Sequence, residues 1–177
     1  MSEVGCKQVL GCEGVRVVGL ISDTHIPKRA LCLPQQVFEL FAGVDHIIHG
    51  GDLVEFAVVD VLEQIAPVLA VCGNMDGVGV GDVLPRLGMF GVFNWKIGVM
   101  HDPGAFFGRS QMRALVCEHG FDVFVYGHTH VADIGWEGST LYINPGSPTV
   151  PASVFSRPSV GLLTITPQNI VPQILKF

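Results

Sequence analysis

The stretch VRVVGLISDTH, residues 15–25, sets a run of β-branched and aliphatic side chains directly before a group of polar ones. Residues 15–21 have the length and composition of a buried strand, and Ser22-Asp23-Thr24-His25 has the composition of a loop. In an extended chain, side chains two residues apart point the same way, so Asp23 and His25 are expected to face a ligand together. The sequence therefore predicts a buried strand that delivers an aspartate and a histidine at its carboxyl end.

The same arrangement recurs twice further along the chain. Residues 46–49 (HIIH) precede Gly50-Gly51-Asp52, and residues 67–72 precede Gly73-Asn74. Helical spacing of apolar side chains predicts one helix after Pro34 and another over residues 55–66. Strands that alternate with helices favour a parallel βαβ arrangement, in which ligands collect at the carboxyl ends of the strands.

From Leu87 onward the pattern changes to mainly short strands. The runs MFGVF and IGVM flank Asn94-Trp95-Lys96 and predict antiparallel strands joined by a tight turn, the second of which ends at His101. The remaining expected elements are a helix over residues 110–119 and strands over residues 123–126, 140–143 and 159–166. These patterns predict an α/β protein with two facing sheets and helices outside them. We expect residues 1–14 to be a loose extension and residues 15–177 to be a single domain.

Composition limits the classes of partner. Charged residues make up 15% of the 177-residue chain and the formal net charge is -6, with no run of basic residues. Binding to long nucleic acid is therefore disfavoured, because that affinity comes from many Lys or Arg contacts with phosphate. The longest apolar run, residues 68–72, is far shorter than the ~20 residues of a membrane-spanning helix, so we expect no membrane partner. The sparse charge makes a homo-oligomer a further hypothesis.

The cysteines bear on the cellular compartment. Their number, 5, is odd, and they include no C-x-x-C pair. A disulfide framework or a thiolate zinc cluster is therefore not expected, and idle thiols fit a reducing environment. The first residues also lack the apolar stretch of a secretory signal. Together these features predict a cytoplasmic location.

Polar residues at the predicted strand ends are the candidates for chemistry. Taken one at a time, each has an ordinary interpretation, since aspartate and asparagine are common in turns and helix caps. Their joint occurrence favours a site, because carboxylate, amide and imidazole groups are oxygen or nitrogen donors and the strand ends converge on one crevice. The residues concerned are Asp23, His25, Asp52, Asn74, His101, His128 and His130.

The order of these motifs resembles that of the calcineurin-like metallophosphoesterase superfamily, and within it of the small single-domain bacterial and archaeal phosphodiesterases. The matching motifs are DTH at residues 23–25, GD at 51–52, GN at 73–74, His101, GHTH at 127–130 and the family-like loop NPGS at 144–147. The resemblance implies an α/β fold that is a four-layer α/β/β/α sandwich of two mixed sheets flanked by helices.

The resemblance also implies two divalent metal ions. One would be held by Asp23, His25, Asp52 and His130, and the other by Asp52, Asn74, His101 and His128, so that Asp52 bridges them. Manganese is our first choice, and nickel, iron, zinc or cobalt also suits nitrogen and oxygen ligands.

The activity implied is a metal-dependent phosphodiesterase that hydrolyses small phosphate diesters by attack of a bridging hydroxide. Asp52, Asn74 and His128 are expected to be the catalytic residues. Two divalent cations outweigh two carboxylates, so the site would attract a phosphate anion although the chain as a whole is acidic.

One position departs from the family pattern. Many members have a histidine after the Gly-Asn pair, and the small phosphodiesterases commonly have a cysteine, whereas this chain has Met75. A thioether cannot donate a proton. We therefore expect slow hydrolysis of poor leaving groups and a preference for aryl diesters.

Two other functions stay open. One is a catalytically weak, protein-binding scaffold, because the family includes a eukaryotic trafficking subunit of that kind and the sparse charge leaves apolar surface for partners. The other is a phosphomonoesterase or phosphoprotein phosphatase. The complete set of candidate ligands favours an enzyme.

Several polar residues near the motifs have two interpretations each. His49 could orient a metal ligand, but a buried histidine with satisfied hydrogen bonds is equally consistent with its position. Asp102 could orient His101 or stabilise the turn before Pro103. Asp76 is expected to make loop hydrogen bonds and to have no catalytic role.

The segment after His101 raises the question of a pocket. Phe106-Phe107 could line one and Arg109 could bind a phosphate, although packing at a helix start is the favoured interpretation. Ser110 is expected to cap that helix. His46 and His119 are expected at the surface.

Overall fold

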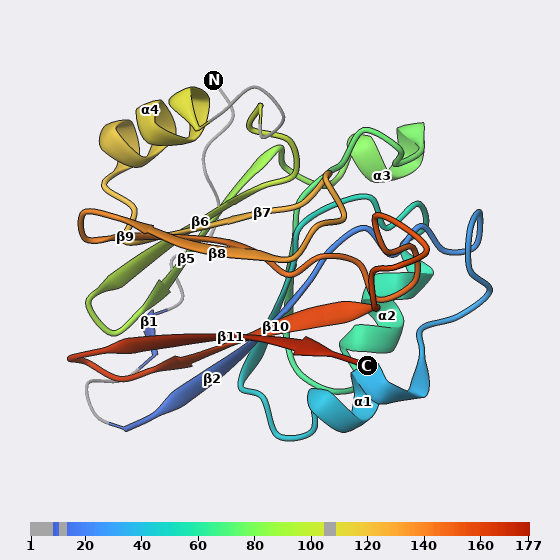
Figure 1. The fold of residues 1–177 in the computed structure, drawn as a ribbon, viewed down its shortest axis with the longest axis horizontal. Helices are drawn as coiled ribbons and strands as arrows, with labels where there is room; N and C mark the ends of the chain where they lie inside the picture. Colours follow the sequence, from blue (N-terminus) through green and yellow to red (C-terminus); the bar gives the residue numbers. More distant parts are fainter. Residues whose placement is uncertain (1–8, 11–13, 105–108) are drawn as a thin grey trace.

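Two β-sheets face each other across an apolar core, and helices cover their outer faces (Figure 1). The computed structural model describes residues 9–10, 14–104 and 109–177. Helix α4 lies outside one sheet, and α1 and α2 lie outside the other. This arrangement confirms the four-layer α/β/β/α sandwich expected from the sequence. No helix among the described residues is both long enough and apolar enough to cross a bilayer.

The five-stranded sheet has the order β11-β10-β2-β3-β4. Its members are β2 (Arg16–Ile21), β3 (His46–His49), β4 (Val68–Ala70), β10 (Ser159–Ile165) and β11 (Ile170–Lys176). The first three are parallel, as the βαβ pattern predicts, and β10 pairs antiparallel with β2. Helices α1 (Gln35–Leu40) and α2 (Ala57–Leu62) are the crossovers between the parallel strands.

The six-stranded sheet has the order β1-β5-β6-β7-β9-β8. Its members are β1 (Val9–Leu10), β5 (Leu87–Val92), β6 (Trp95–Met100), β7 (Val123–Tyr126), β8 (Asp133–Glu137) and β9 (Thr140–Asn144). Strands β5 and β6 form the expected antiparallel hairpin, and β6, β7 and β9 are parallel. Helix α3 (Val78–Gly81) connects β4 of the five-stranded sheet to β5, and α4 (Ser110–His119) connects β6 to β7.

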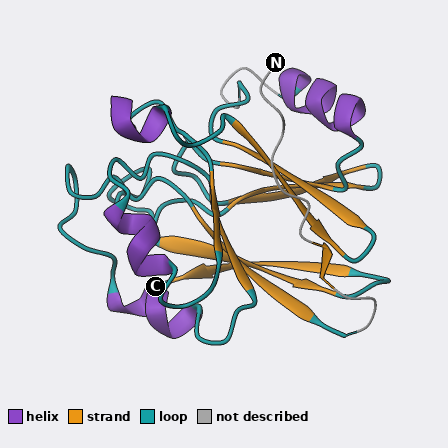
Figure 2. Cartoon of the chain, turned by 180° about the vertical axis from the view of Figure 1, so that it is seen from behind, coloured by secondary structure: helices purple, strands orange, loops and turns teal. Residues whose placement is uncertain are grey.

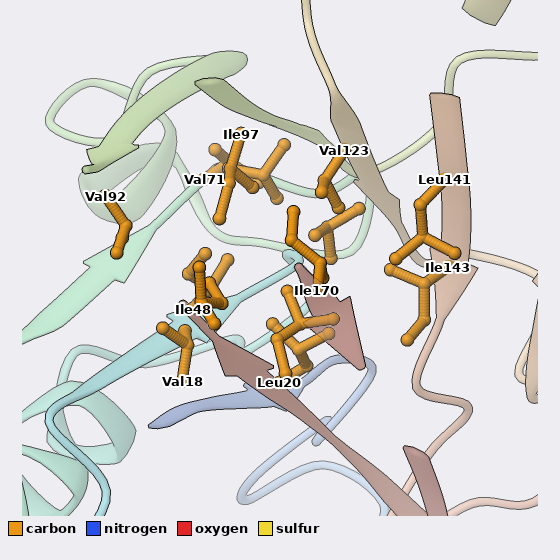
Figure 3. Packing of buried hydrophobic residues seen from close by; sticks show 14 residues of the cluster. Val18, Leu20, Ile48, Val71, Val92, Ile97, Val123, Leu141, Ile143 and Ile170 are labelled. Atoms are coloured by element: carbon orange, nitrogen blue, oxygen red, sulfur yellow. The ribbon is translucent and has the colours of Figure 1, made fainter. Parts of the chain in front are cut away.

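The core between the sheets explains why the strand sequences are so apolar. Val18 and Leu20 of β2 point toward Val123 and Leu141 of the opposite sheet, and all four are fully buried (Figure 3). The outward-facing residue Ile21 is buried as well, in the cluster that includes residues of α1 and α2. A strand covered on both faces needs apolar side chains at nearly every position. Packing on both faces also fixes where such a strand ends.

Two expectations about single residues are wrong. Ser110 does not cap α4, because it is the first helical residue, and the preceding Arg109 makes no side-chain capping hydrogen bond. His46 is not at the surface: it is 9% exposed and lies against the ring of Phe90, 4.8 Å away between ring centroids. The period of two along β3 puts His46 on the same face as Ile48, toward the core. His119 is partly exposed.

The buried ring of His46 predicts acid sensitivity. Neither ring nitrogen has a hydrogen-bond partner, and burial lowers the pKa of His46 below its usual 6.5. A lowered pKa in the folded state means that the unfolded chain takes up the proton first, so stability is lost as pH falls below 6.5.

We expect His46→Leu to remove the part of the acid-induced loss of stability that comes from protonation of His46. The difference in unfolding free energy between variant and wild type should grow in favour of the variant as pH falls, by at most ~1.4 kcal/mol per pH unit for one proton. Urea unfolding of both metal-free proteins across neutral and mildly acid pH measures it. A pH-independent difference would contradict the prediction.

Candidate functional site

The carboxyl ends of five strands meet at one end of the sandwich. In β2, β3 and β4 the parallel pairing brings these ends to one edge of the five-stranded sheet, and the parallel pair β6 and β7 does the same in the other sheet. The loops that follow gather on one side of the molecule in both views (Figures 1 and 2). The structure thereby brings together all seven residues predicted from the sequence: Asp23, His25, Asp52, Asn74, His101, His128 and His130.

Short contacts join the first group of side chains. The Nε2 atoms of His25 and His130 are 3.1 Å apart, and His130 Nε2 lies 3.4 Å from Asp23 Oδ1. These three residues offer one nitrogen or oxygen each within 4.8 Å of one another. Such an arrangement could hold one metal ion.

A second group lies beside the first. His101 Nε2 is 3.2 Å from Asp52 Oδ2 and 3.0 Å from Asn74 Oδ1, and His128 Nδ1 is 2.8 Å from the same Asn74 oxygen. The two groups are connected, because His25 Nε2 lies 3.7 Å from Asp52 Oδ2 and His101 Nε2 lies 3.9 Å from Asp23 Oδ1. The seven donors therefore form one continuous cluster with Asp52 between its halves.

The backbone at this cluster is not extended, which corrects the reason given above for pairing Asp23 with His25. Both residues have positive φ, 55° and 48°, in the left-handed region. Seven described non-glycine residues have positive φ, and five of them are site residues. Those five are Asp23, His25, Asp52, His128 and His130. Aspartate and histidine tolerate this region better than most residues, and a concentration of such φ values is typical of functional sites.

Two glycines of the motifs allow close approach of the loops. A Cβ on Gly73 would lie 2.1 Å from Asp52 Oδ1, and a Cβ on Gly127 would lie 2.1 Å from Ser22 Oγ and 2.9 Å from Asp23 Oδ2. Neither position can carry a side chain unless the loops move apart. The glycines before Asn74 and His128 are therefore required by packing around the two aspartates.

Hydrogen bonds outside the cluster fix the orientation of two histidines. His101 donates from Nδ1 to the carbonyl of Gly50 at 2.8 Å, and His130 donates from Nδ1 to the carbonyl of Val150. With Nδ1 turned to a carbonyl, each ring has Nε2 in the cluster, where it could supply the lone pair for a metal ion. Metal-binding histidines in proteins commonly have this arrangement.

Burial and charge act in opposite directions on the aspartates. Asp23 is fully buried, and burial raises its pKa although His101, Ser22 and His130 oppose the shift. Burial also acts on Asp52, but the hydrogen bond and charge of His101 outweigh it and lower the pKa of Asp52. Among the described residues, no Lys or Arg forms an ion pair with either carboxylate. The cluster is thus an acidic site that a cation would stabilise.

Asp76 stabilises the loops beside the cluster, as the sequence analysis expected. Its carboxylate accepts backbone N–H groups from Asp52 at 3.2 Å, Val54 at 2.6 Å and Gly73 at 2.7 Å. These bonds join the loop after β3 to the loop after β4. The neighbouring Met75 uses its backbone N–H to donate to Asp52 Oδ1 at 2.7 Å.

Arg109 does not reach the cluster. Its guanidinium donates to Asp133 at 2.8 Å and to Glu137 at 3.2 Å, and lies over the ring of Tyr142. The phosphate-binding interpretation of Arg109 therefore has no support in these contacts, and packing beside α4 explains it. The proposed pocket at Phe106-Phe107 lies outside the described residues.

Asp102 takes part in both interactions that the sequence left open, but with a different histidine. Its Oδ1 accepts the backbone N–H of Gly104 at 2.9 Å, which stabilises the turn. Its Oδ2 lies 3.6 Å from His128 Nε2, not beside His101.

Three further residues support the site. Asn144 donates from Nδ2 to the carbonyl of Gly127 at 2.9 Å and to Thr129 Oγ1 at 3.1 Å. Ser147 donates to the carbonyl of Asp23, and Thr149 donates to the carbonyl of Thr24, each at 2.8 Å. The NPGS motif marked this loop in the sequence without giving it a role, and no local pattern marked Thr149.

The contacts of Asp76 predict a loss of stability in Asp76→Asn. An amide has one acceptor oxygen, so at least one of the three backbone N–H groups loses its partner, at a cost of about 1–3 kcal/mol. Asp82→Asn is the matched control, because Asp82 is exposed and its side chain does not bridge two loops in the described structure. Urea unfolding measures both variants, and equal stability of the two would contradict the prediction.

Comparisons with known proteins agree with this geometry. The chain is 39% identical over 163 residues to a probable metallophosphoesterase of Methanothermobacter thermautotrophicus, which covers 90% of this chain and 92% of the relative. It is 29% identical over 139 residues to a phosphodiesterase of Methanocaldococcus jannaschii, covering 73% and 82% of the two chains. The fold resembles that of Vps29 from Entamoeba histolytica, solved in complex with zinc, with a TM-score of 0.73, 23% identity and coverage of 90% and 98%. The model of the calcineurin-like phosphoesterase superfamily domain matches residues 17–168, and the chain belongs to that superfamily.

Proposed function

We propose that this protein is a metal-dependent phosphodiesterase that acts on small phosphate diesters. The observation that carries the proposal is the cluster of seven oxygen and nitrogen donors from two sheets, centred on two buried aspartates without a Lys or Arg partner among the described residues. A phosphoesterase of this superfamily needs such a donor set, and the phosphodiesterase of Methanocaldococcus jannaschii supports the choice of diesters.

The spacing of the donors fits divalent cations. Atoms bound to one ion at about 2.0–2.2 Å lie roughly 3 Å apart. The distances of 3.1 Å between the Nε2 atoms of His25 and His130 and 3.2 Å between Asp52 and His101 are in that range. We assign one ion to Asp23, His25, Asp52 and His130, and the other to Asp52, Asn74, His101 and His128. Asp52 Oδ2 lies near histidines of both sets, which supports its bridging role.

Two divalent cations, when bound, would supply positive charge that activates water and stabilises the phosphoryl oxygens. The residues of the chain prepare the site for this chemistry. The Nδ1 atoms of His101 and His130 donate to backbone carbonyls, which leaves Nε2 of each ring as the atom that would bind a cation. Asn74 Oδ1 lies 3.0 Å from His101 Nε2 and 2.8 Å from His128 Nδ1, so one amide oxygen is in contact with both imidazoles. Asp52, Asn74 and His128 are the proposed catalytic residues.

The charges around the site favour small substrates. Arg16, Arg109 and Arg113 are each engaged in an ion pair on other parts of the molecule. The chain as a whole has a formal net charge of -6 and no run of basic residues, so it offers few contacts to the phosphates of a long nucleic acid. The donor set suits manganese, nickel, iron, zinc or cobalt, of which manganese stays our first choice.

The scaffold alternative has one specific observation in its favour. Val154 and Phe155 are 94% and 95% exposed in the loop that follows Thr149. Such side chains suit contact with another protein or a second copy of the chain. We also keep the expectation of a cytoplasmic location, which the free thiols of Cys32, Cys72 and Cys117 support.

The proposal predicts hydrolysis of bis(p-nitrophenyl) phosphate that depends on added manganese and is lost with a chelator. Asp52→Asn and His128→Ala should each lower the rate by more than about 100-fold, since loss of a ligand exceeds the loss of a supporting contact. Arg109→Gln is the control and should keep the wild-type rate, because Arg109 bonds to Asp133 and Glu137.

The matched monoester, p-nitrophenyl phosphate, separates the alternatives. The proposal expects faster turnover of the diester. Faster turnover of the monoester would favour a phosphomonoesterase, and a folded wild type without activity on either ester in manganese, nickel or cobalt would favour the scaffold.

Met75 predicts a dependence on the leaving group. Its side chain cannot donate a proton, so alkyl diesters should react slowly relative to aryl diesters. Met75→His adds a donor next to Asn74, and general acid catalysis contributes about 10²–10⁴-fold where it operates. The variant should accelerate an alkyl diester more than an aryl diester in paired kcat measurements. An equal change for both esters would contradict this role.

A further inference from the structure

His49 is a buried titratable residue that the proposed chemistry does not use. It ends β3, its exposed fraction is 0%, and it belongs to neither group of candidate metal-binding atoms among the described residues. Both of its ring nitrogens nevertheless have partners in loops that carry the candidate ligands. His46, at the other end of the same strand, has none.

The hydrogen bonds of His49 define its protonation. The backbone N–H of Gly51 donates to His49 Nδ1 at 3.2 Å, so Nδ1 carries a lone pair and the proton is on Nε2. Nε2 then donates to Thr24 Oγ1 at 3.1 Å. A neutral ring with a fixed tautomer thus joins the loop after β2 to the loop after β3. Burial and the nearby His101 lower the pKa of His49 to about 3, which keeps the ring neutral.

Both partners of His49 lie where the backbone bends. Thr24 stands between Asp23 and His25, whose φ values are 55° and 48°. Gly51 has a φ of 92° and precedes Asp52, which has a φ of 57°. Left-handed backbone at non-glycine residues persists only where the surroundings hold it in place. The hydrogen bonds of His49 to Thr24 and Gly51 therefore help to fix the direction of the Asp23, His25 and Asp52 side chains.

Backbone hydrogen bonds also join the loop after β2 to the loop after β3. Asp23 N–H donates to the carbonyl of Gly51 at 3.0 Å, and His25 N–H donates to the carbonyl of Asp52 at 2.9 Å. These bonds hold the backbones together. The imidazole of His49 adds a link on the buried side, where no water competes for its partners.

We propose that His49 is a positioning residue, which holds the loops at residues 22–25 and 50–52 at the spacing in which Asp23, His25 and Asp52 bind the same divalent cation. This inference rests on the proposed function, because it takes those three residues as metal ligands. It adds a role that neither the family match nor the cluster itself assigns.

The test separates the two hydrogen bonds of His49. His49→Leu removes both, His49→Asn keeps an acceptor near the position of Nδ1, and His49→Gln keeps a donor near the position of Nε2. Binding of Mn²⁺ to the metal-free full chain is measured by calorimetry. We expect His49→Leu to bind about 10–100-fold more weakly than wild type, and the two amide variants to recover part of the loss.

His46→Leu is the matched control, because it removes a buried imidazole from the same strand without touching either loop. It should bind Mn²⁺ with wild-type affinity. The visible absorption spectrum of the Co²⁺-loaded protein provides a second readout: the bands should change in His49→Leu and stay unchanged in His46→Leu.

Thr24→Val removes the other partner of the hydrogen bond between His49 and Thr24. It provides the test if His49→Leu fails to fold. It removes the hydroxyl and keeps the shape, so it should weaken Mn²⁺ binding, and the double variant with His49→Gln should bind no more weakly than the weaker single variant. Wild-type affinity in both Thr24→Val and His49→Leu would overturn the inference, as would an equal loss in His46→Leu and His49→Leu. Wild type that binds Mn²⁺ but cleaves no diester would contradict the proposed function alone.

Discussion

The two halves of the candidate site are joined by contacts of the Asp52 carboxylate. Its Oδ2 atom lies 3.2 Å from His101 of the six-stranded sheet and 3.7 Å from His25 of the five-stranded sheet. A buried carboxylate is costly without a partner, and within the described structure histidines are its charged or chargeable partners. This contact connects the two sheets at their open end. It also explains why so many supporting bonds, from Asp76 and Met75, converge on this one loop.

The two packed sheets place the strand ends so that Asp52 can contact histidines from both sheets. Parallel strands buried on both faces fix where each strand ends, and the core between the sheets fixes how the two sets of ends face each other. The loops adopt left-handed backbone at the site residues. Close contacts at glycines hold them there, together with backbone N–H bonds to Asp76 and His49 and a bond that Asn144 donates to Gly127. Rigid strands with tightly bonded loops are the arrangement expected of a preorganised metal site.

The sequence predicted the strands that end in site residues, because burial on both faces leaves a continuous apolar run that is easy to recognise. It missed β8, which is an edge strand where Asp133 and Gly135 interrupt the pattern and side chains are half exposed. It also missed the partners of Arg109, which follow 24 and 28 residues later in the chain. The left-handed backbone at Asp23 and the burial of His46 depend on tertiary contacts that no local spacing encodes. The residue set of the candidate site was nevertheless predictable, since five short motifs mark it.

We propose that donors from both sheets bind two divalent cations around Asp52. Anomalous diffraction from crystals of the full chain grown with Mn²⁺ tests it most directly. We expect two manganese positions about 3.5–4 Å apart, with the Asp52 carboxylate between them, His25 and His130 at one, and His101 and His128 at the other. A single position, or manganese bound away from Asp52, would contradict it.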